Sequence, residues 1–445
     1  MRGCGIHWFN RRVPLLNDVK SAQRVLRNIM RSRRNRREVA RRLETLEPPA
    51  PGSLKIAVYF ADTRVNLYQI RQWYAPLAAL SKRWPVAIIG RSPGTTLSMW
   101  DEAPVPTVYL RRVVDLEEFV QQHDIRIVFY VNQNSKNFQM FRYGRMWHVF
   151  INHGESDKMY MTTNQFKAYD YSFIAGDAAR ERLTRKLWNF DADRKTIQIG
   201  RPQADHFAGV LPYTPDERTV VLYAPTWEGD RAAASYGSIA SHGVELVNTL
   251  LSTGTHRVIY RPHPRSGVID AVYRAANEEI IASITAANTS DPGAQHVFDD
   301  GPELGWQLAA ADVAITDVSA MVYDRLAVGK PLIVARPVSA EADVDESGYL
   351  GACEWLYASD AADIVSIVDR VQHSDEARAS LEHWVTRHFG DTTPGAATAR
   401  FHAAIETLVA EWDRNEAIHS GDKRTSESDP FDSDEDEDQM PSDND

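Results

Sequence analysis

The sequence predicts an α/β fold with two doubly wound parallel sheets in tandem. Short apolar runs alternate with longer helical stretches, a pattern that is typical of parallel sheets covered by helices. The length of 445 residues fits about two domains with extensions at the ends. The composition, with 43 % hydrophobic and 25 % charged residues, is that of a folded globular chain. We expect the two domains to face each other across a cleft.

Seven apolar runs predict the strands of a first domain at residues 54–213. Each run is short and ends at polar, Gly or Pro residues, as buried strands do. The predicted strands are residues 54–61, 86–90, 107–110, 125–131, 148–152, 171–176 and 196–200.

Five further runs predict a second domain of the same kind at residues 214–412. Its predicted strands are residues 219–225, 256–262, 294–298, 312–316 and 331–337, with helical stretches between them. In open parallel sheets, ligands bind beyond the carboxyl ends of the strands, so residues that follow a strand are candidates for the site.

The first 53 residues predict a basic amphipathic helix and a Pro-rich linker. Residues 1–46 carry thirteen Lys or Arg and three Asp or Glu, although the whole chain has a net charge of −11. One helical stripe is apolar and precedes an Arg-rich run at 31–37; it consists of Leu15, Val19, Ala22, Leu26 and Ile29. We expect residues 15–37 to contact an anionic membrane surface. A partner helix, a nonspecific basic arm or packing on the protein itself are the alternatives.

The last residues, 413–445, predict a disordered acidic tail. Eleven acids and two bases lie in residues 420–445, and such a composition cannot bury a core. A solvating end is the simplest interpretation, and its acids do not have the spacing of a metal site.

Composition also excludes several classes of protein. The two cysteines, Cys4 and Cys353, are too far apart in sequence for a CxxC site, and they cannot build a disulfide scaffold. The chain shows no apolar run of about 20 residues and no signal-peptide core. A basic head on an acidic body is not the profile of a nucleic-acid binder. We therefore expect a cytoplasmic protein that does not cross the bilayer.

Two predicted strands lead directly into a histidine. His153 follows residues 148–152 in "INHGESDK", and His263 follows residues 256–262 in "YRPHP". One histidine falls in each domain at a carboxyl strand end, so the two are candidates for a single site in the cleft.

The segment "ITDVSAMVYD" predicts a strand, a polar turn and a helix. Asp317 and Ser319 lie in the turn, where Ser319 can cap the helix and where backbone N–H groups can bind a phosphate. Asp324 lies two helical turns after Asp317 and is a candidate for a sugar hydroxyl. The alternatives are a plain cap for Ser319 and a solvated charge for Asp324.

Three further segments carry candidate ligand contacts. Thr226 and Trp227 lead from a strand into a loop that can cover a ligand, and Trp227 is a candidate either for stacking on a base or for the core. Arg201 is either a phosphate contact or a hinge residue. Thr392 and Thr393 precede an expected helix start at Pro394, where a cap or a second phosphate nest can form.

Five motifs, taken in this order, resemble the CDP-glycerol glycerophosphotransferase family. Members of that family have the GT-B fold and build wall teichoic acid and related polyol-phosphate polymers. The resemblance covers about residues 145–410. It rests on His153-Gly154 with Lys158, "YAPTW", "YRPHP", "TDVSAMVYD" and "DTTPGAATAR".

The resemblance implies a transferase with two Rossmann-like domains. It would move glycerol phosphate or ribitol phosphate from CDP-glycerol or CDP-ribitol to a hydroxyl of a lipid-linked acceptor and release CMP. The N-terminal domain would bind the acceptor and the C-terminal domain the nucleotide donor, with no bound cofactor or metal. The enzyme would lie on the inner face of the plasma membrane.

The resemblance also implies roles for single residues. His153 would be the catalytic base, and His263 with Arg261 would stabilise the pyrophosphate. Gly154, Lys158 and Trp227 would line the acceptor side or the cleft. A sugar-nucleotide glycosyltransferase or epimerase, and a non-catalytic scaffold of a polymer-synthesis complex, are the alternative functions that remain.

Overall fold

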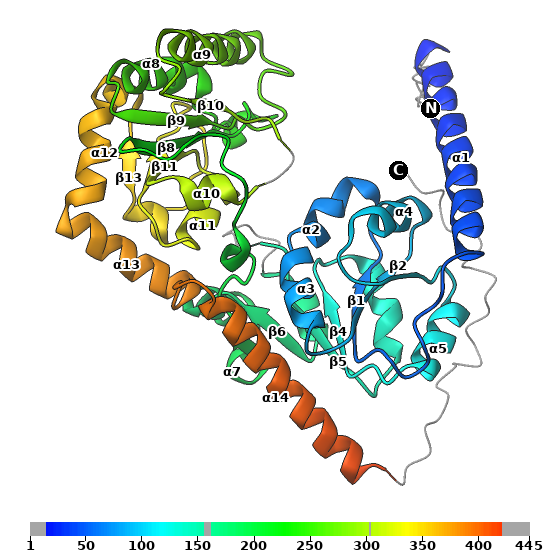
Figure 1. The fold of residues 1–445 in the computed structure, drawn as a ribbon. Helices are drawn as coiled ribbons and strands as arrows, with labels where there is room; N and C mark the ends of the chain where they lie inside the picture. Colours follow the sequence, from blue (N-terminus) through cyan, green and yellow to red (C-terminus); the bar gives the residue numbers. More distant parts are fainter. Residues whose placement is uncertain (1–14, 155–161, 302–303, 421–445) are drawn as a thin grey trace, which may run out of the picture. The chain divides into compact units, whose positions relative to one another are not determined.

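The computed structural model describes residues 15–154, 162–301 and 304–420, and it describes the side chains of the first helix at Arg27 and from Ile29 onwards. The chain divides into two compact units, one that ends at Met146 and one that contains Trp147–Ser420. Both units are built from parallel strands and helices (Figure 1). The expected boundary between residues 213 and 214 falls inside the second unit and stays a prediction.

The first unit contains a parallel sheet with the strand order β3-β2-β1-β4. Its central strand β1 is buried at every residue, as expected for a parallel strand with both faces covered. The elements are α1 (Leu15–Leu43), β1 (Ile56–Phe60), α2 (Leu67–Arg71), α3 (Tyr74–Ser81), β2 (Val86–Gly90), α4 (Pro93–Glu102), β3 (Thr107–Tyr109), α5 (Val113–Gln122) and β4 (Ile127–Tyr130).

Helix α1 confirms the helix that was expected in the basic head, and it extends further, to Leu43. Ser32, Asn35 and Val39 are buried on the side of α1 that packs on α4. Their spacing of three and four residues defines one face of a helix. The second half of α1 therefore packs on the protein itself, while Arg33 and Arg37 are exposed on the other side.

The second unit begins with three parallel strands, β5 (Trp147–Phe150), β6 (Tyr171–Ile174) and β7 (Thr196–Gln198). A six-stranded parallel sheet follows with the order β10-β9-β8-β11-β12-β13. Its strands are β8 (Thr219–Ala224), β9 (His256–Tyr260), β10 (Val297–Phe298), β11 (Val313–Thr316), β12 (Leu332–Ala335) and β13 (Glu354–Leu356).

Helices cover both faces of the six-stranded sheet (Figure 1). One core contains residues of α8, α9 and α12, and the other contains residues of α10, α11 and α13. Successive residues of β8, such as Val221 and Leu222, belong to opposite cores, as the period of two in a strand requires. The helices of this unit are α6 (Asp177–Lys186), α7 (Ala192–Lys195), α8 (Val244–Ser252), α9 (Ala271–Ser290), α10 (Trp306–Ala310), α11 (Ala320–Leu326), α12 (Ile364–His373), α13 (Asp375–Phe389) and α14 (Ala396–Ile418).

The last helix, α14, packs on β5 and β6 of the same unit (Figure 1). The Trp147 indole N–H donates to the carbonyl of Leu408 at 3.0 Å. The rings of Phe173 and Phe401 meet edge to face, with centroids 6.1 Å apart. Because α14 runs to Ile418, residues 413–418 are helical and do not belong to a disordered tail. Residues 421–445 of the expected tail lie outside the described residues.

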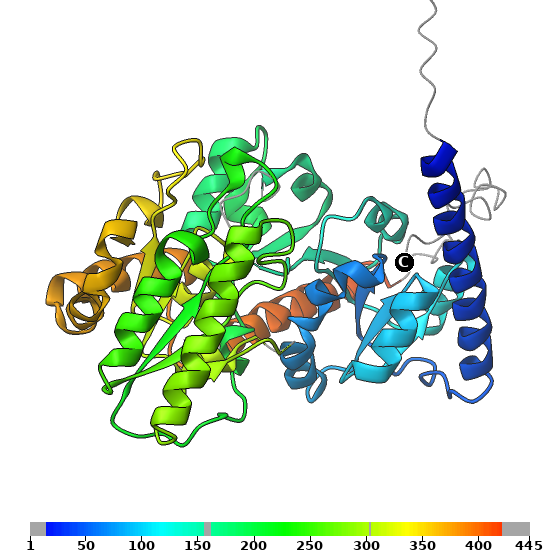
Figure 2. The same cartoon turned by 90° about the horizontal axis from the view of Figure 1, so that it is seen from above.

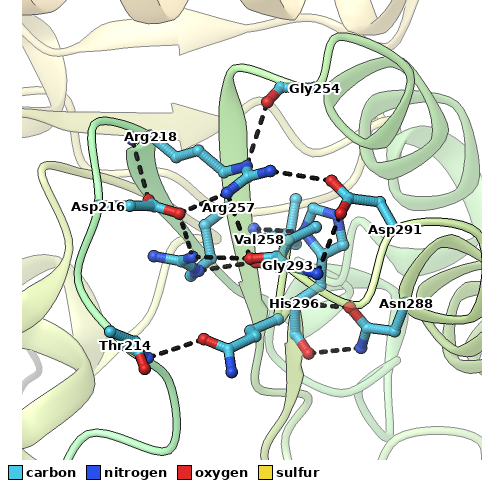
Figure 3. Close-up of polar contacts among 12 residues, drawn as sticks. Thr214, Asp216, Arg218, Gly254, Arg257, Val258, Asn288, Asp291, Gly293 and His296 are labelled. Carbon is cyan, nitrogen blue, oxygen red and sulfur yellow. Dashed lines mark hydrogen bonds and ion pairs between the residues drawn. The ribbon is translucent and has the colours of Figure 1, made fainter.

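A network of ion pairs lies at the amino-terminal edge of the six-stranded sheet (Figure 3). Arg218 and Arg257 both pair with Asp216, and Arg218 also reaches Asp291 at 2.8 Å. The fully buried Arg257 donates to the carbonyl of Ala294 at 2.8 Å. These charges are neutralised within the fold, which leaves the opposite, carboxyl edge as the place for a ligand.

The predicted α/β class is confirmed, and all twelve predicted strands are present with ends that differ from the prediction by at most three residues. The sequence analysis missed β13, a strand of only three residues at the sheet edge with one buried side chain. Such a short segment carries too little alternation to be recognised as a strand.

Candidate active site

Three neighbouring strands of the six-stranded sheet end in the predicted motifs. Strand β8 leads into Thr226 and Trp227, β9 into His263, and β11 into Asp317 and Ser319. Parallel pairing sets Ala224 beside Thr316 and Tyr223 beside Tyr260, so the three loops leave the same edge of the sheet. We call these five residues, Thr226, Trp227, His263, Asp317 and Ser319, the carboxyl-edge site.

Asp317 joins two loops of the carboxyl-edge site. Its Oδ2 accepts hydrogen bonds from the backbone N–H of Thr226 at 2.7 Å and of Ser238 at 3.1 Å. The residue is fully buried, and burial raises the pKa of Asp317 to about 7 although these bonds act in the opposite direction. One carboxyl group thus fixes both ends of the loop 226–238. The predicted contact of Asp317 with the donor stays a prediction.

His263 is held in one tautomer by its own loop. Its Nδ1 accepts a hydrogen bond from the backbone N–H of Arg265 at 3.1 Å, and its backbone N–H donates to the carbonyl of Pro225 at 3.2 Å. Burial, together with the Arg265 charge, lowers the pKa of His263 against the attraction of Glu228. The imidazole is therefore neutral near pH 7 with its proton on Nε2, and it is a hydrogen-bond donor at that atom.

Trp227 forms the wall beside His263. The two rings are nearly parallel, with centroids 6.5 Å apart and an interplanar angle of 29°. The guanidinium of Arg265 lies 3.7 Å from the centroid of the indole ring, within the range of a cation–π contact. Trp227 is half-buried in this cluster, so it is not a fully buried core residue. Its stacking on a base stays a prediction.

Glu228, which the sequence analysis did not single out, holds the loop that carries His263. Its buried carboxylate accepts three backbone N–H hydrogen bonds, from Gly267 at 3.0 Å and from Ile269 and Asp270 at 3.1 Å. Burial raises the pKa of Glu228, but these bonds outweigh burial and lower the pKa below its usual range. In the sequence, the position of Glu228 directly after Trp227 at the strand end is the local feature that could have pointed to its support of the loop.

The carbonyl groups of the same loop are held from the other side. Arg274 donates to the carbonyl of Gly267 at 2.9 Å and to that of Val268 at 3.2 Å. Gly267 has a φ of +71°, and a Cβ at this position would lie 2.6 Å from Cα of Arg274. Only glycine fits this close approach in a left-handed conformation. The loop from His263 to Asp270 is therefore defined by internal contacts.

Arg261 and Ser319 have partners within the fold. The guanidinium of Arg261 pairs with Asp299 and donates to the carbonyl of Gly301 at 3.0 Å. Ser319 caps α11, since its Oγ accepts a hydrogen bond from the backbone N–H of Met321 at 3.2 Å. The predicted phosphate contacts of both residues stay predictions, and for Arg261 the charge is already shared with a carboxylate.

Arg201 and Asp324 form a buried ion pair at 2.5 Å. Their side chains are 7 % and 9 % exposed, so Asp324 is not the solvated charge that the sequence allowed. Burial raises the pKa of Asp324, and the Arg201 charge opposes this shift. The pair connects the segment after β7 with α11. The two alternatives for Arg201, a phosphate contact and a hinge residue, both stay predictions.

A carboxylate occupies the amino terminus of α14, where a phosphate nest was expected. Asp205 accepts hydrogen bonds from the backbone N–H of Gly395 at 3.1 Å and of Thr398 at 2.6 Å. The helix begins at Ala396, two residues after the expected start at Pro394. Asp205 already accepts hydrogen bonds from these N–H groups, so they do not need an anion as a partner. Binding of the CDP-polyol by Thr392 and Thr393 stays a prediction.

His153 and Gly154 follow β5, in the first group of strands of the unit. The preceding Asn152 has a φ of +55°, and its side-chain amide donates to the carbonyl of Gly154. Asparagine tolerates this left-handed conformation better than most residues. His153 is half-buried at the strand end, as expected. Lys158 lies outside the described residues.

The structure thus brings together His263, Trp227, Thr226, Asp317 and Ser319, and it pairs Arg201 with Asp324. His153 lies at the end of a strand in the other group, β5–β7. In the described ranges, no group of His, Cys, Asp or Glu side chains is arranged to hold a metal ion.

Comparison with known families identifies the family of this chain. The model of the CDP-glycerol:poly(glycerophosphate) glycerophosphotransferase family matches residues 150–406, more than half of the chain. This chain belongs to that family. All the residues of the carboxyl-edge site, and His153, fall inside the matched segment. The glycerophosphotransferase is therefore an enzyme that takes its polyol phosphate from a CDP-activated donor.

Solved structures share the fold of this glycerophosphotransferase at low identity. The wall teichoic acid polymerase TagF is 14 % identical, with a TM-score of 0.50, over 89 % of this chain and 98 % of its own. A Listeria monocytogenes protein described as a UDP-N-acetylglucosamine 2-epimerase is 14 % identical, with a TM-score of 0.51, over 81 % of this chain and 98 % of its own. Both likenesses indicate the GT-B fold. No curated protein sequence matches this chain.

Replacement of Glu228 by Gln is expected to lower kcat of the glycerophosphotransferase without a matching rise in KM. The Gln side chain would face three N–H groups with one carbonyl and one amide NH₂, so the His263 loop would lose part of its support. A shift on the order of 1 Å at a reacting group can cost about 10²-fold in rate, and we expect a loss of roughly tenfold. Steady-state kinetics of Glu228→Gln measure this.

The matched control for Glu228→Gln is Glu245→Gln, because Glu245 is exposed on α8. NMR of the imidazole nitrogens adds a direct measurement of the His263 tautomer, which a merely destabilising substitution would not change in the folded protein. If Glu228→Gln kept both the parent kcat and the parent nitrogen shifts, Glu228 would not position His263.

Proposed function

We propose that this glycerophosphotransferase binds a CDP-polyol at the carboxyl-edge site and transfers its polyol phosphate to a hydroxyl of a lipid-linked acceptor, with release of CMP. The observation that carries the proposal is the state of His263. A neutral imidazole with its proton fixed on Nε2 can donate to a phosphate oxygen at the strand ends where ligands of parallel sheets bind.

The reaction that we propose needs one group that accepts a proton and another that donates a hydrogen bond. The acceptor hydroxyl loses its proton to His153, its oxygen forms a bond to the β-phosphorus of the donor, and the bond from that phosphorus to the CMP oxygen breaks. The proton on Nε2 of His263 stabilises the charge that collects on the leaving phosphate. Positioning and charge stabilisation would supply most of the rate, without a covalent enzyme intermediate.

A donor comparison tests the proposed function. The full chain is incubated with a soluble acceptor analogue and CDP-glycerol, CDP-ribitol or UDP-N-acetylglucosamine, and nucleotide release and product mass are measured. Release of CMP with a product heavier by one polyol phosphate is the expected result. Release of UDP would favour the sugar-nucleotide alternative, and release of neither nucleotide would favour a scaffold.

The basic head supports a proposed contact with the membrane. In the described ranges, none of the helices combines the length and the apolar character that a bilayer crossing requires. The Arg side chains at 33, 36 and 37 are exposed on α1, whereas Ser32, Asn35 and Val39 are buried. We therefore propose peripheral binding of residues 15–37 to the anionic inner face of the plasma membrane, where a lipid-linked acceptor is presented.

Removal of three exposed charges from α1 is expected to weaken membrane binding by roughly 100-fold, because each Lys or Arg near an anionic surface contributes about 1 kcal/mol. The variant is Arg33→Gln with Arg36→Gln and Arg37→Gln, which leaves the face that packs on α4 intact. Co-sedimentation with vesicles that contain phosphatidylglycerol measures the binding. Added salt should weaken the parent in the same way, since the Debye length is about 10 Å at 0.1 M.

The matched control removes the same number of charges from the second unit, with Arg185→Gln, Lys186→Gln and Arg194→Gln, all of which are exposed. This control should sediment like the parent. Equal sedimentation of the α1 variant and the parent would show that the basic head is not the membrane contact.

A further inference from the structure

A cavity lies where α1 packs on α4, and all the residues that line it belong to the first unit. Its volume is about 360 Å³, within the range of small-molecule sites. Residues of α1 on one helical row, Arg34, Glu38 and Arg42, line one wall, and Arg64 with the first turns of α4 line the other. Figure 2 shows α1 in dark blue, beside the blue and cyan elements of the same unit.

The two carboxylates of this cavity are already neutralised. Glu38 pairs with Arg41 at 2.6 Å and with Arg42 at 3.1 Å, and Arg42 also pairs with Asp101 at 2.6 Å. Hydrogen bonds from Arg41 and Arg42 lower the pKa of Glu38 to about 2, so its carboxylate stays ionised and bound. The charge of Glu38 is therefore neutralised within α1, and the charge of Asp101 is neutralised by the ion pair that joins α4 to α1.

The remaining donors of the cavity have no such partners. Arg34 and Arg64 form no ion pair with any residue that the structure describes. Asn35 is 7 % exposed, and its side-chain Nδ2 makes no hydrogen bond within the described ranges although it is buried. A buried amide donor without a partner costs free energy, and a ligand with acceptor oxygens would remove that cost.

The amino-terminal turn of α4 adds a further preference for an anion. Gly94 lies in this first turn and lines the cavity, and the N–H groups of a first turn have no acceptor within their own helix. Arg34, Arg64, the buried Asn35 and the first turn of α4 thus line one space. Guanidinium groups bind phosphate oxygens in pairs of parallel hydrogen bonds.

We propose that the cavity between α1 and α4 binds a phosphate group together with its attached polyol or headgroup. Arg34 and Arg64 supply the charge, and Asn35 supplies a neutral hydrogen bond. The volume exceeds what a phosphate alone would need, which leaves room for an organic substituent. A phospholipid headgroup and a soluble phosphate ester share this chemistry. The proposal does not depend on the donor site or on the transfer reaction.

Binding of soluble probes to the full chain tests the proposal first. Inorganic phosphate and glycerol 3-phosphate are titrated calorimetrically, with chloride at matched ionic strength as the reference. Saturable binding is expected for the parent. Arg34→Gln and Arg64→Gln should each raise Kd at least about tenfold, as loss of a charge-assisted hydrogen bond does. Arg37→Gln, on the same helix but outside the cavity, should bind like the parent.

Asn35→Leu separates binding from packing. This variant removes the buried donor and keeps a side chain of similar size, so the melting temperature should stay equal or rise while affinity for the probes falls. Loss of affinity together with retained stability supports a ligand contact, whereas retained affinity would overturn the role of Asn35. Arg64 is exposed, so Arg64→Gln remains informative even if substitutions at Asn35 fail to fold.

Vesicles distinguish the two sources of the phosphate. Sedimentation is compared between phosphatidylcholine vesicles and vesicles with added phosphatidylglycerol. Soluble binding that depends on Arg34 and Arg64 assigns the cavity to a phosphate ester. Vesicle binding that falls more in Arg64→Gln than in Arg37→Gln, without soluble binding, assigns it to a headgroup. If neither assay distinguished Arg34→Gln and Arg64→Gln from Arg37→Gln, the proposal would be wrong, whatever the nucleotide-release assay shows.

Discussion

His263→Ala is expected to lower kcat by about 10²–10³, the usual cost of losing one donor that stabilises a developing charge. The structure provides the physical reason, because Nδ1 of His263 is occupied by the N–H of Arg265 and Nε2 must carry the proton. His263→Gln should recover part of the loss, because its amide can still donate. Steady-state and single-turnover kinetics with a CDP-polyol measure both variants.

The pH dependence adds a second measurement for His263. Its pKa is lowered, so the neutral imidazole with a proton on Nε2 persists as the pH falls through the usual value of about 6.5. Any loss of rate that comes from protonation of Nδ1 should therefore occur below pH 6.5 and should be absent from His263→Gln. The control is His373→Ala, since His373 is exposed on α12. Equal rates in His263→Gln and His263→Ala would argue against a donor role.

His153→Ala is expected to lower kcat by about 10²–10⁴, the range for loss of a general base. A Gln at this position cannot accept a proton, so His153→Gln should be as slow as His153→Ala, in contrast to the pair of variants at His263. His153 is half-buried after β5, and its removal should leave the fold intact. Rates of CMP release and thermal unfolding of each variant measure these effects.

The acidity of the acceptor tests the base role of His153 directly. An analogue with a more acidic hydroxyl needs less help in losing its proton, so the rate difference between His153→Ala and the parent should shrink with that analogue. A rate difference that stays constant across acceptors of different acidity would indicate that His153 binds or positions the acceptor and does not accept its proton.

The fold could be predicted because its signals are local. Each buried strand, such as β8 or β11, is a run of apolar residues bounded by polar ones, and such a run can be recognised from a few residues. The cap at Ser319 is also local, since donor and acceptor lie two residues apart. The α/β class, the positions of the strands along the chain and the motifs at the strand ends followed from such patterns.

The partners of charged residues could not be predicted in this way. Asp324 pairs with Arg201, and Asp205 caps a helix that begins about 190 residues later. Glu228 binds N–H groups about 40 residues away. None of these distances has a period or a spacing rule, because they depend on how complete elements pack. For this reason the sequence analysis proposed ligand contacts for several residues, such as Arg201, Asp324 and Ser319, that have partners within the fold.

The position of α14 has a consequence for the synthesis of the chain. The Trp147 indole bonds to Leu408, 261 residues later, and the Tyr171 hydroxyl bonds to Glu411 at 2.8 Å, 240 residues later. At 5–20 residues per second, a ribosome needs roughly 10–50 s to make that intervening length. Throughout that interval, strands β5 and β6 have emerged without the helix that covers them. A ribosome that stops inside α14 therefore releases a chain with this surface uncovered, whereas one that stops after residue 420 releases a chain in which every contact described above can form.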